Sequence, residues 1–370
     1  MPATFRDRLA ARYCLFLFTF VMMMLFCFSC LAEPAAIPES GATVNLYESS
    51  VSISNGVLDA SGIPISDTAK LKDMLKLNPD IKKVKLTGCG LTLAQMKDLR
   101  LSFPKIDFSW SLSIYNLTVS SGDTFIDLGR KRISNVEEFK DFLDCFPSLT
   151  KVDMYNSWLK RAQLDELYNR YPNIRFGWTL HIFEHTVRTD VTAFSTLHNN
   201  RCPTHSSEAF EQLKYCRDLV ALDLGHNCIQ DISFLRNFPK LKVLILACNY
   251  VTDVSVLAEL KDLEYVELFK NRITDISPMA NHEKLLDLNI CFNKITDVSM
   301  LFTNTNLQRL WMYHNKLTDE QNLAMRTALP NCKVDFKSYS TLGGWREHPR
   351  FFTLHEFFRS RVFKPFDKAQ

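Results

Sequence analysis

A period of 22 residues in the C-terminal half constrains the fold more than any other feature of the sequence. Four copies follow one another without a gap from Leu219 to Asn306, and a fifth copy that begins at Leu307 runs longer at its end. Their shared pattern is LxxLxLxxNxIxDISxLxxLxx. A fixed period of this length is typical of a repeat protein, because one copy alone cannot bury its apolar face and must stack on its neighbours.

The leucine spacing predicts one short strand in each copy. A strand of two or three residues turns Leu222 and Leu224 inward, and stacked copies form a parallel sheet over an aliphatic core. The predicted fold class is therefore an α/β solenoid, a right-handed superhelix with a parallel β-sheet on its concave face and short helices or 3₁₀ turns on its convex face.

Two polar ladders accompany the leucines. One asparagine per copy follows the strand, where its amide can satisfy backbone groups in a tight buried bend. In Asp275-Ile276-Ser277-Pro278 the Ser-Pro step is typical of a helix cap and first turn, so we interpret the aspartates as structural rather than as an acidic site. The predicted ladders are Asn227, Asn249, Asn271, Asn293 and Asn315, and Asp231, Asp253, Asp275, Asp297 and Asp319.

The N-terminal half contains a second, larger period of 68 residues. Residues 57–124 align with 125–192, and the alignment places Trp110 on Trp178. Each unit divides into repeats of 24 and 25 residues and a 19-residue excursion, whose alternating pattern predicts a strand and allows a hairpin. Cys89 and Ser157 take the asparagine position, so the ladder is weaker there.

We expect one continuous solenoid rather than two domains. The predicted segments are a signal peptide or signal anchor (1–32), a linker (33–56), the duplicated units (57–192), a loop or degenerate repeat (193–218), the 22-residue repeats (219–336) and a C-terminal cap or tail (337–370).

The first 32 residues are typical of an export signal. Arg6, Arg8 and Arg12 precede an uncharged stretch from Tyr13 to Ala32. Cleavage after Ala32, a lipid on Cys30 and an uncleaved anchor all fit, because 20 apolar residues can just span a bilayer. In each case the chain after Glu33 lies outside the cytoplasm, which predicts a secreted or cell-surface protein.

Charge and cysteine content limit the partners. The formal net charge is +3, and the first 32 residues supply +2 from three arginines and one aspartate, so about +1 remains. A nucleic-acid partner would require a concentrated basic stripe, so we expect none. Cys202 and Cys216 flank a polar stretch and are the first candidates for a disulfide.

The copies from Leu219 to Asn331 resemble the 22-residue leucine-rich repeats of bacterial internalin-type surface proteins. The resemblance covers about a third of the chain and rests on five copies with both ladders in register. It implies a secreted or surface-held bacterial protein that binds other proteins through its curved sheet. The C-terminus has no LPxTG-type signal and no immunoglobulin-like domain is evident, so wall attachment and an invasin role are not carried over.

The strand positions that point away from the core define the predicted binding face. Large apolar groups stand there among charged ones, and exposed clusters of this kind usually mark an interface with aromatic anchors. A protein partner is expected, with a glycan as the alternative. A C-terminal tail that folds back over these groups is the competing interpretation. The predicted binding residues are Val243, Ile245, Tyr265, Glu267, Phe269, Asp287, Arg309, Trp311 and Tyr313.

The segment from Lys337 to Gln370 leaves the repeat pattern and is aromatic and basic. Its aromatic residues include Trp345, Phe351, Phe352, Phe357, Phe358, Phe363 and Phe366. We expect it to cover the open end of the core, as terminal caps must. A contact surface for a partner or a membrane is the alternative.

One motif points to an enzyme. His181, Glu184 and His185 fit H-x-x-E-H, in which two histidines on one helical face hold zinc and the glutamate acts as base. Here the flanking residues alternate with period two, which predicts a strand, and the 68-residue register aligns the motif with Ser113 to Leu117, which cannot bind a metal. A zinc hydrolase is therefore a remote alternative, and we expect no enzyme, metal or cofactor.

The sequence thus favours an exported protein that recognises a protein or glycan on its concave sheet. A structural spacer or subunit of a cell-envelope assembly is the second hypothesis. A membrane contact is expected only through the N-terminal segment.

Overall fold

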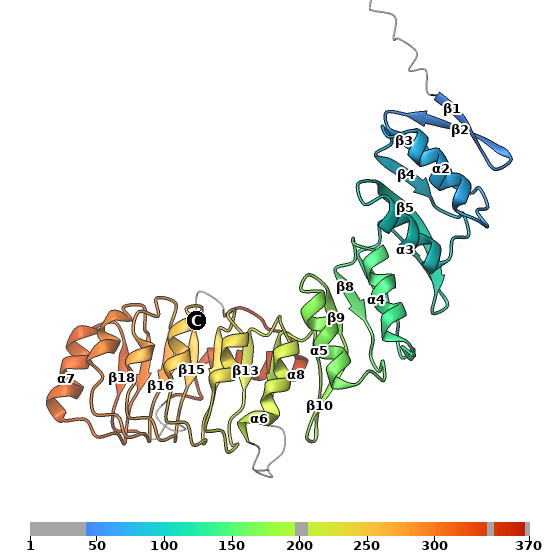
Figure 1. Ribbon diagram of the computed structural model, residues 1–370. Helices are drawn as coiled ribbons and strands as arrows, with labels where there is room; N and C mark the ends of the chain where they lie inside the picture. Colours follow the sequence, from blue (N-terminus) through green and yellow to red (C-terminus); the bar gives the residue numbers. More distant parts are fainter. Residues whose placement is uncertain (1–41, 197–205, 339–343, 367–370) are drawn as a thin grey trace, which may run out of the picture. The chain divides into compact units, whose positions relative to one another are not determined.

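The computed structural model describes residues 42–196, 206–338 and 344–366, which form two compact units, one ending at Leu112 and the other beginning at Ser113 (Figure 1). The predicted export signal and Cys202 lie outside the described residues. Within the described ranges, none of the helices combines the length and the apolar character needed to span a bilayer.

The first unit is built on a sheet in the order β1-β2-β3-β4-β5. The first three strands pair antiparallel, and β3, β4 and β5 pair parallel. The elements are β1 (Ala42–Leu46), β2 (Ser49–Ser54), β3 (Val57–Asp59), α2 (Ala69–Leu77), β4 (Lys83–Leu86), α3 (Leu93–Ser102) and β5 (Asp107–Ile114). Residues 42–54 therefore form a hairpin rather than the linker predicted for 33–56, because Leu46 and Val51 supply buried apolar side chains.

Strand β6 (Leu117–Ser120) follows β5, and the elements after it repeat β3 to β6 with an offset of 68 residues. They are β7 (Phe125–Asp127), α4 (Val136–Cys145), β8 (Lys151–Asp153), α5 (Arg161–Arg170), β9 (Arg175–Gly177), β10 (Thr179–Ile182) and β11 (His185–Arg188). Strands β7, β8 and β9 pair parallel, and β10 and β11 form an antiparallel hairpin. The excursion around Trp178 is thus a hairpin, as the alternating pattern allowed.

The 22-residue repeats form a seven-stranded parallel sheet, β12 to β18, which is separate from the sheets before it. Its strands are β12 (Ala193–Ser195), β13 (Ala221–Asp223), β14 (Val243–Ile245), β15 (Tyr265–Glu267), β16 (Asp287–Asn289), β17 (Arg309–Trp311) and β18 (Lys333–Asp335). We expected one continuous solenoid, but its strands form separate sheets, and the β10–β11 hairpin lies between β9 and β12 in the chain.

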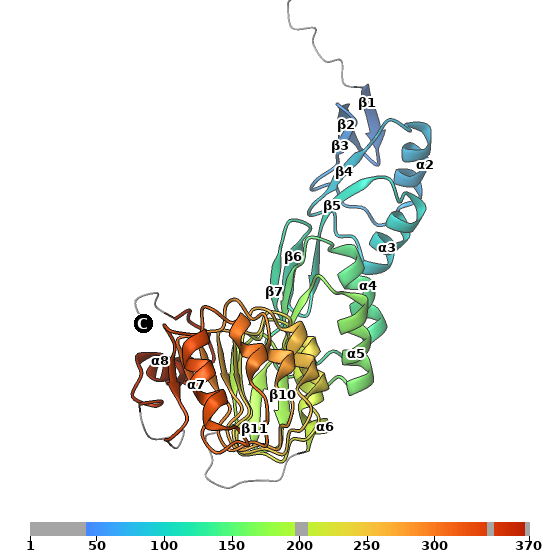
Figure 2. The ribbon, with the colours of Figure 1, turned by 90° about the vertical axis from the view of Figure 1, so that its left-hand side faces the viewer.

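Short helices cover the opposite side of this sheet (Figure 2). They are α6 (Ser207–Phe210) and the 3₁₀ helices η2 (Glu211–Tyr215), η3 (Ser233–Asn237), η4 (Ser255–Glu259), η5 (Ser277–Met279) and η6 (Ser299–Thr303), followed by α7 (Asp319–Ala328). The aliphatic core lies between the two layers, where Leu222, Leu244 and Leu288 are fully buried. This arrangement confirms the predicted solenoid, with strands on the concave face and short helices on the convex face.

The asparagine ladder joins each repeat to its neighbours. The Asn249 amide donates to the carbonyl oxygens of Leu224 (2.9 Å) and Leu246 (3.1 Å), and its Oδ1 accepts the Ile229 N–H (3.0 Å). Asn271, Asn293 and Asn315 repeat this pattern one copy further on. These bonds satisfy backbone groups at the buried bend, as the sequence predicted.

The aspartate ladder caps the 3₁₀ helices. Asp275 accepts the Ser277 N–H (2.8 Å) and the Ser277 hydroxyl (2.9 Å). Asp231, Asp253 and Asp297 accept the equivalent N–H groups. The structural interpretation holds, although the aspartate rather than the serine accepts the capping bonds.

Candidate functional site

The concave face presents the outward strand positions in the predicted register. Ala221, Val243, Tyr265, Asp287 and Arg309 lie side by side across five strands. Glu267 lies opposite Asn289, which lies opposite Trp311, in the row two positions further along. Parallel strands that start at the same point of every copy produce these rows.

Most of the predicted binding residues are buried, which corrects the expectation that they face solvent. Tyr265, Asp287 and Trp311 are each 0% exposed. Val243, Ile245, Glu267 and Arg309 are also buried. Of the predicted set, only Phe269 and Tyr313 keep a partly accessible surface.

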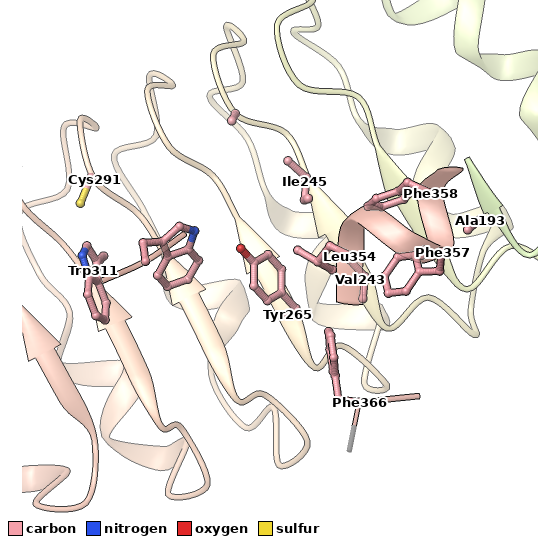
Figure 3. Close-up of a cluster of buried hydrophobic side chains, with 13 residues drawn as sticks. Ala193, Val243, Ile245, Tyr265, Cys291, Trp311, Leu354, Phe357, Phe358 and Phe366 are labelled. Atoms are coloured by element: carbon pink, nitrogen blue, oxygen red, sulfur yellow. The ribbon is translucent and has the colours of Figure 1, made fainter. Parts of the chain in front are cut away.

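A segment from the C-terminal tail covers these groups. Helix α8 (Pro349–Ser360) crosses the concave side of the strands, and its Leu354 and Phe357 face them (Figure 3). Trp345 lies between Tyr265 and Trp311, with ring centroids 5.4 and 5.3 Å apart. The aromatic side chains of the tail thus bury the apolar groups of the sheet, which is the competing interpretation of the sequence.

The expectation that this tail caps the end of the core is wrong. Strand β18 pairs with β17 at that end, and helix α7 packs beside η6. Val334, Met325 and Leu329 supply the buried apolar side chains there. The last repeat therefore covers its own end, which leaves the aromatic tail free to lie on the sheet.

A buried ion cluster anchors the tail. The Arg350 guanidinium donates to both carboxylate oxygens of Asp287 (2.7 and 3.0 Å), and Arg309 Nε donates to the same carboxylate (2.6 Å). Arg350 also donates to Gln308 Oε1 at 2.8 Å. Asp287 lies on β16 and Arg350 on α8, so this cluster holds the helix in one place on the sheet.

Two further contacts fix the ends of α8. The Arg350 N–H donates to the ring of His348, which caps the N-terminus (3.3 Å). Burial and the nearby Arg309 and Arg350 lower the pKa of His348 to about 4, which keeps the ring able to accept. At the other end, Thr192 Oγ1 accepts the Phe363 N–H at 2.7 Å.

An aromatic strip remains accessible just after the carboxyl ends of β15, β16 and β17. We use this name for Phe269, Phe292, Tyr313 and His314. The Phe292 ring lies 5.4 Å from Phe269, 5.7 Å from Tyr313 and 4.6 Å from the His314 ring, measured between centroids. His314 is exposed, and the other three are partly buried.

Sequence reasoning missed Phe292 because it considered only alternating strand positions. Phe292 occupies the eighth position of its repeat, where the backbone has φ 56°. The same position has positive φ at His226, Cys248, Lys270 and His314. A residue with positive φ leaves the extended conformation, so the strand alternation does not predict where its side chain points. The sequence signal for this position was the recurrence of His, Lys and Phe in it.

The H-x-x-E-H residues lie on a hairpin. His181 belongs to β10 and His185 to β11, with Phe183 in the turn at φ 54°. The motif therefore lacks the helix that its zinc chemistry requires. In the part of the chain that the structure describes, no cluster of three or more His, Cys, Asp or Glu side chains could hold a metal ion.

The cysteines of the described residues are thiols. They are Cys89, Cys145, Cys216, Cys228, Cys248, Cys291 and Cys332. Cys89 donates to the Ala60 carbonyl oxygen (3.0 Å), which confirms its place in the ladder. The candidate pair of Cys216 with Cys202 stays a prediction, since Cys202 lies outside the described residues.

Comparisons with solved structures show similarity to bacterial repeat proteins. Internalin C2 of Listeria monocytogenes is 25% identical, over 42% of this chain and 76% of its own, with a TM-score of 0.30. The internalin inlF of Listeria monocytogenes is 16% identical over 78% and 84%, with a TM-score of 0.31. A leucine-rich-repeat protein of Leptospira interrogans is 14% identical over 75% and 95%, with a TM-score of 0.31. No curated protein matches the chain.

The family model "Leucine Rich repeats (2 copies)" matches residues 217–259 and 239–284. The matched residues include β13, β14 and β15 with their asparagine bends. The remaining strands up to β17 continue the same 22-residue register. The 22-residue units at residues 217–284 therefore match leucine-rich repeats, and the later units share their register.

Proposed function

We propose that this chain is an exported binding protein that recognises another protein through the aromatic strip on the concave side of its repeats. The strip carries the proposal, because Phe269, Phe292 and Tyr313 form a continuous row of rings that the tail leaves partly accessible. Aromatic side chains dominate the energetics of protein interfaces. Stacked repeats also offer an extended concave surface, which suits a macromolecule better than a small ligand.

The tail changes which part of the concave side a partner can reach. Tyr265 and Trp311 are covered, so they stabilise the docked tail rather than a free binding surface. Helix α8 itself carries an exposed aromatic side chain, Phe352, which is 60% exposed.

Site-specific crosslinking tests the strip. A photoreactive aromatic amino acid at position 292 should form an adduct with one protein of the cell surface or the medium, and Phe269→Ser with Tyr313→Ser should abolish it. Leu323→Ser is the matched control, because Leu323 is 65% exposed on α7 and lies outside the strip. An adduct that survives the double substitution overturns the site, and an adduct with a polysaccharide reassigns the ligand to a glycan.

The export proposal rests on the charge pattern of residues 1–32. Mass spectrometry of the native protein should find a mature N-terminus after Ala32, or a retained or lipidated segment, in a fraction outside the cytoplasm. A full-length chain that is found only in the cytoplasm would contradict export.

A further inference from the structure

A cavity of ≈ 360 Å³ lies between the concave sheet and helix α8. On the sheet side Asp223, Ile245 and Glu267 line it, and on the helix side Leu354 and Phe358 line it. Figure 3 shows Ile245 on its strand close to Leu354 and Phe358 of the crossing helix. This volume falls at the lower end of the range for small-molecule pockets, about 300–1,000 Å³.

Two carboxyl groups in this cavity are deeply buried. Asp223 is 2% exposed and accepts bonds from the Ser195 hydroxyl (2.8 Å) and the Gly225 N–H (3.0 Å). Glu267 is 6% exposed, and its Oε2 accepts from Trp345 Nε1 (3.2 Å) and the Tyr265 hydroxyl (3.3 Å). All four donors are neutral.

Neither carboxyl group forms an ion pair within the described ranges of the chain. Asp287, on the next strand, shows the usual arrangement, with two arginines on one buried carboxylate. Buried charges in proteins are normally paired, since an unpaired one loses its hydration without compensation. A cation bound in the cavity would therefore compensate the buried carboxylates of its walls.

The surrounding charges do not supply it. Arg346 lines the cavity and acts on Glu267 beyond ion-pair distance, while Arg309 is bound to Asp287. His226 and His355 also line the cavity. Burial and the nearby Arg346 and Lys270 lower the pKa of His226, so that ring is neutral near pH 7.

Burial also raises the pKa of Asp223 to about 7 and raises that of Glu267. The Glu267 carboxylate adds to the rise in the pKa of Asp223, because two like charges in one cavity repel. A cation bound in the cavity would lower the pKa of both carboxyl groups, because it stabilises their ionised forms.

We propose that this cavity binds an organic ammonium ion with an apolar body. The ammonium group donates to the carboxylates of Asp223 and Glu267, and the apolar body packs against Ile245, Leu354 and Phe358. This site is independent of the protein partner proposed for the aromatic strip. A ligand of this class would also touch α8 and the sheet at once, and would strengthen the docking of the tail.

Calorimetry on the full chain tests the proposal with alkylammonium ions from butyl to octyl and the alcohols of equal length. The best ammonium ion should bind at least about tenfold more tightly than its alcohol at pH 7, as expected for hydrogen bonds to a charged group. Its binding should release protons, seen as a heat that depends on the buffer, because the carboxyl groups ionise. Equal affinity for amine and alcohol, or binding by neither series, overturns the proposal.

Variants locate the site. Asp223→Asn with Glu267→Gln should reduce ammonium binding to the level of the alcohol, whereas Asp262→Asn, an exposed carboxylate paired with Lys284, should change nothing. Ala247→Leu fills the cavity from the sheet side, so it should weaken the binding of both the ammonium ions and the alcohols. This variant tests the site if the double variant does not fold. An ammonium preference that survives these changes would place binding elsewhere and contradict the assignment.

Discussion

The parallel strands β3–β5 of the first sheet and the strands of the seven-stranded sheet both carry charged side chains on their outward faces, but these charges differ in burial. On β3, β4 and β5, Lys85 pairs with Asp59 (3.1 Å) and Lys83 with Asp107 (2.8 Å), and all four side chains are 42–66% exposed. On β16 and β17, Asp287 and Arg309 pair at 2.6 Å and are 0% and 5% exposed beneath the tail. The repeat geometry thus places charged side chains in rows. Whether the tail buries a row determines how much its ion pairs affect stability.

The bends that follow the strands also differ between the two regions. In the 22-residue repeats the Asn249 amide joins three backbone groups of two copies. In the longer repeats the equivalent Cys89 makes one short contact, from its weakly donating thiol to the Ala60 carbonyl oxygen (3.0 Å). The longer repeats have full α-helices on the other side, so their stacking depends more on helix packing, with Leu71 and Met96 fully buried.

The largest expected effect tests the buried side of this comparison. Asp287→Ala should cost about 3–5 kcal/mol of unfolding free energy, because it leaves Arg309 and Arg350 buried without their carboxylate. Urea unfolding measures the loss, and limited proteolysis should show release of residues 344–366. A loss below about 1 kcal/mol would mean that the cluster is hydrated and does not anchor the tail.

The pH dependence of stability should have opposite signs in the two faces. Burial raises the pKa of Asp223 from 3.8 to about 7, so the folded state holds more protons between these values. Stability from this group is full below pH 3.8 and is lost as the pH rises toward 7, by an amount on the order of 4 kcal/mol. Asp223→Asn should flatten urea-unfolding energies over this range, and parallel curves for variant and wild type would contradict the buried, unpaired state.

Asp59 supplies the contrast. Its bonds with Ser61 and Lys85 lower the pKa of this carboxyl group, so its contribution is present above the unfolded value and is lost as the pH falls through the folded one. Asp59→Asn should therefore remove this small contribution near pH 7, where the wild type keeps it, and make little difference to the urea-unfolding free energy at acid pH, where the wild type has lost it.

Substitution in the two ladders compares the bends. Asn249→Ala should cost about 2–3 kcal/mol, because it leaves the Ile229 N–H buried without a partner and removes one of the two amide donors from the carbonyl oxygens of Leu224 and Leu246. Cys89→Ala should cost about 1 kcal/mol, since it removes one weak bond and a small volume. Urea unfolding followed by a probe in each unit separates the effects, and equal losses would show that the ladder is not what distinguishes the repeats.

The smallest effect is expected at the exposed pairs. Lys85→Ala should change the unfolding free energy by less than about 0.5 kcal/mol, because solvent screens the pair with Asp59. Adding salt should reduce this difference further. A loss comparable to that of Asp287→Ala would show that exposure does not explain the contrast between the faces.

The elements whose patterns are local could be predicted from the sequence. The strand register, the asparagine bends and the aspartate caps each depend on residues within one or two repeats, and each position recurs often enough to be recognised. Phe292 was missed because its direction depends on a left-handed backbone at the end of the strand, which the alternation does not encode. The hairpin at His181 and His185 was only partly foreseen, since alternation indicates strands but does not specify where the turn falls.

The amino-acid sequence by itself determined the repeat, its parallel sheet and which side chains stand on the concave face, because stacking of identical units leaves few other ways to bury the leucines. Only the tertiary structure decided that this face is covered and that the aromatic strip and the cavity beside α8 are what remains accessible. The physical reason is that Asp287 and Arg350 are far apart in the chain, and their pairing is not part of the repeat pattern. The pair can form only after the sheet has folded and the tail has docked on it.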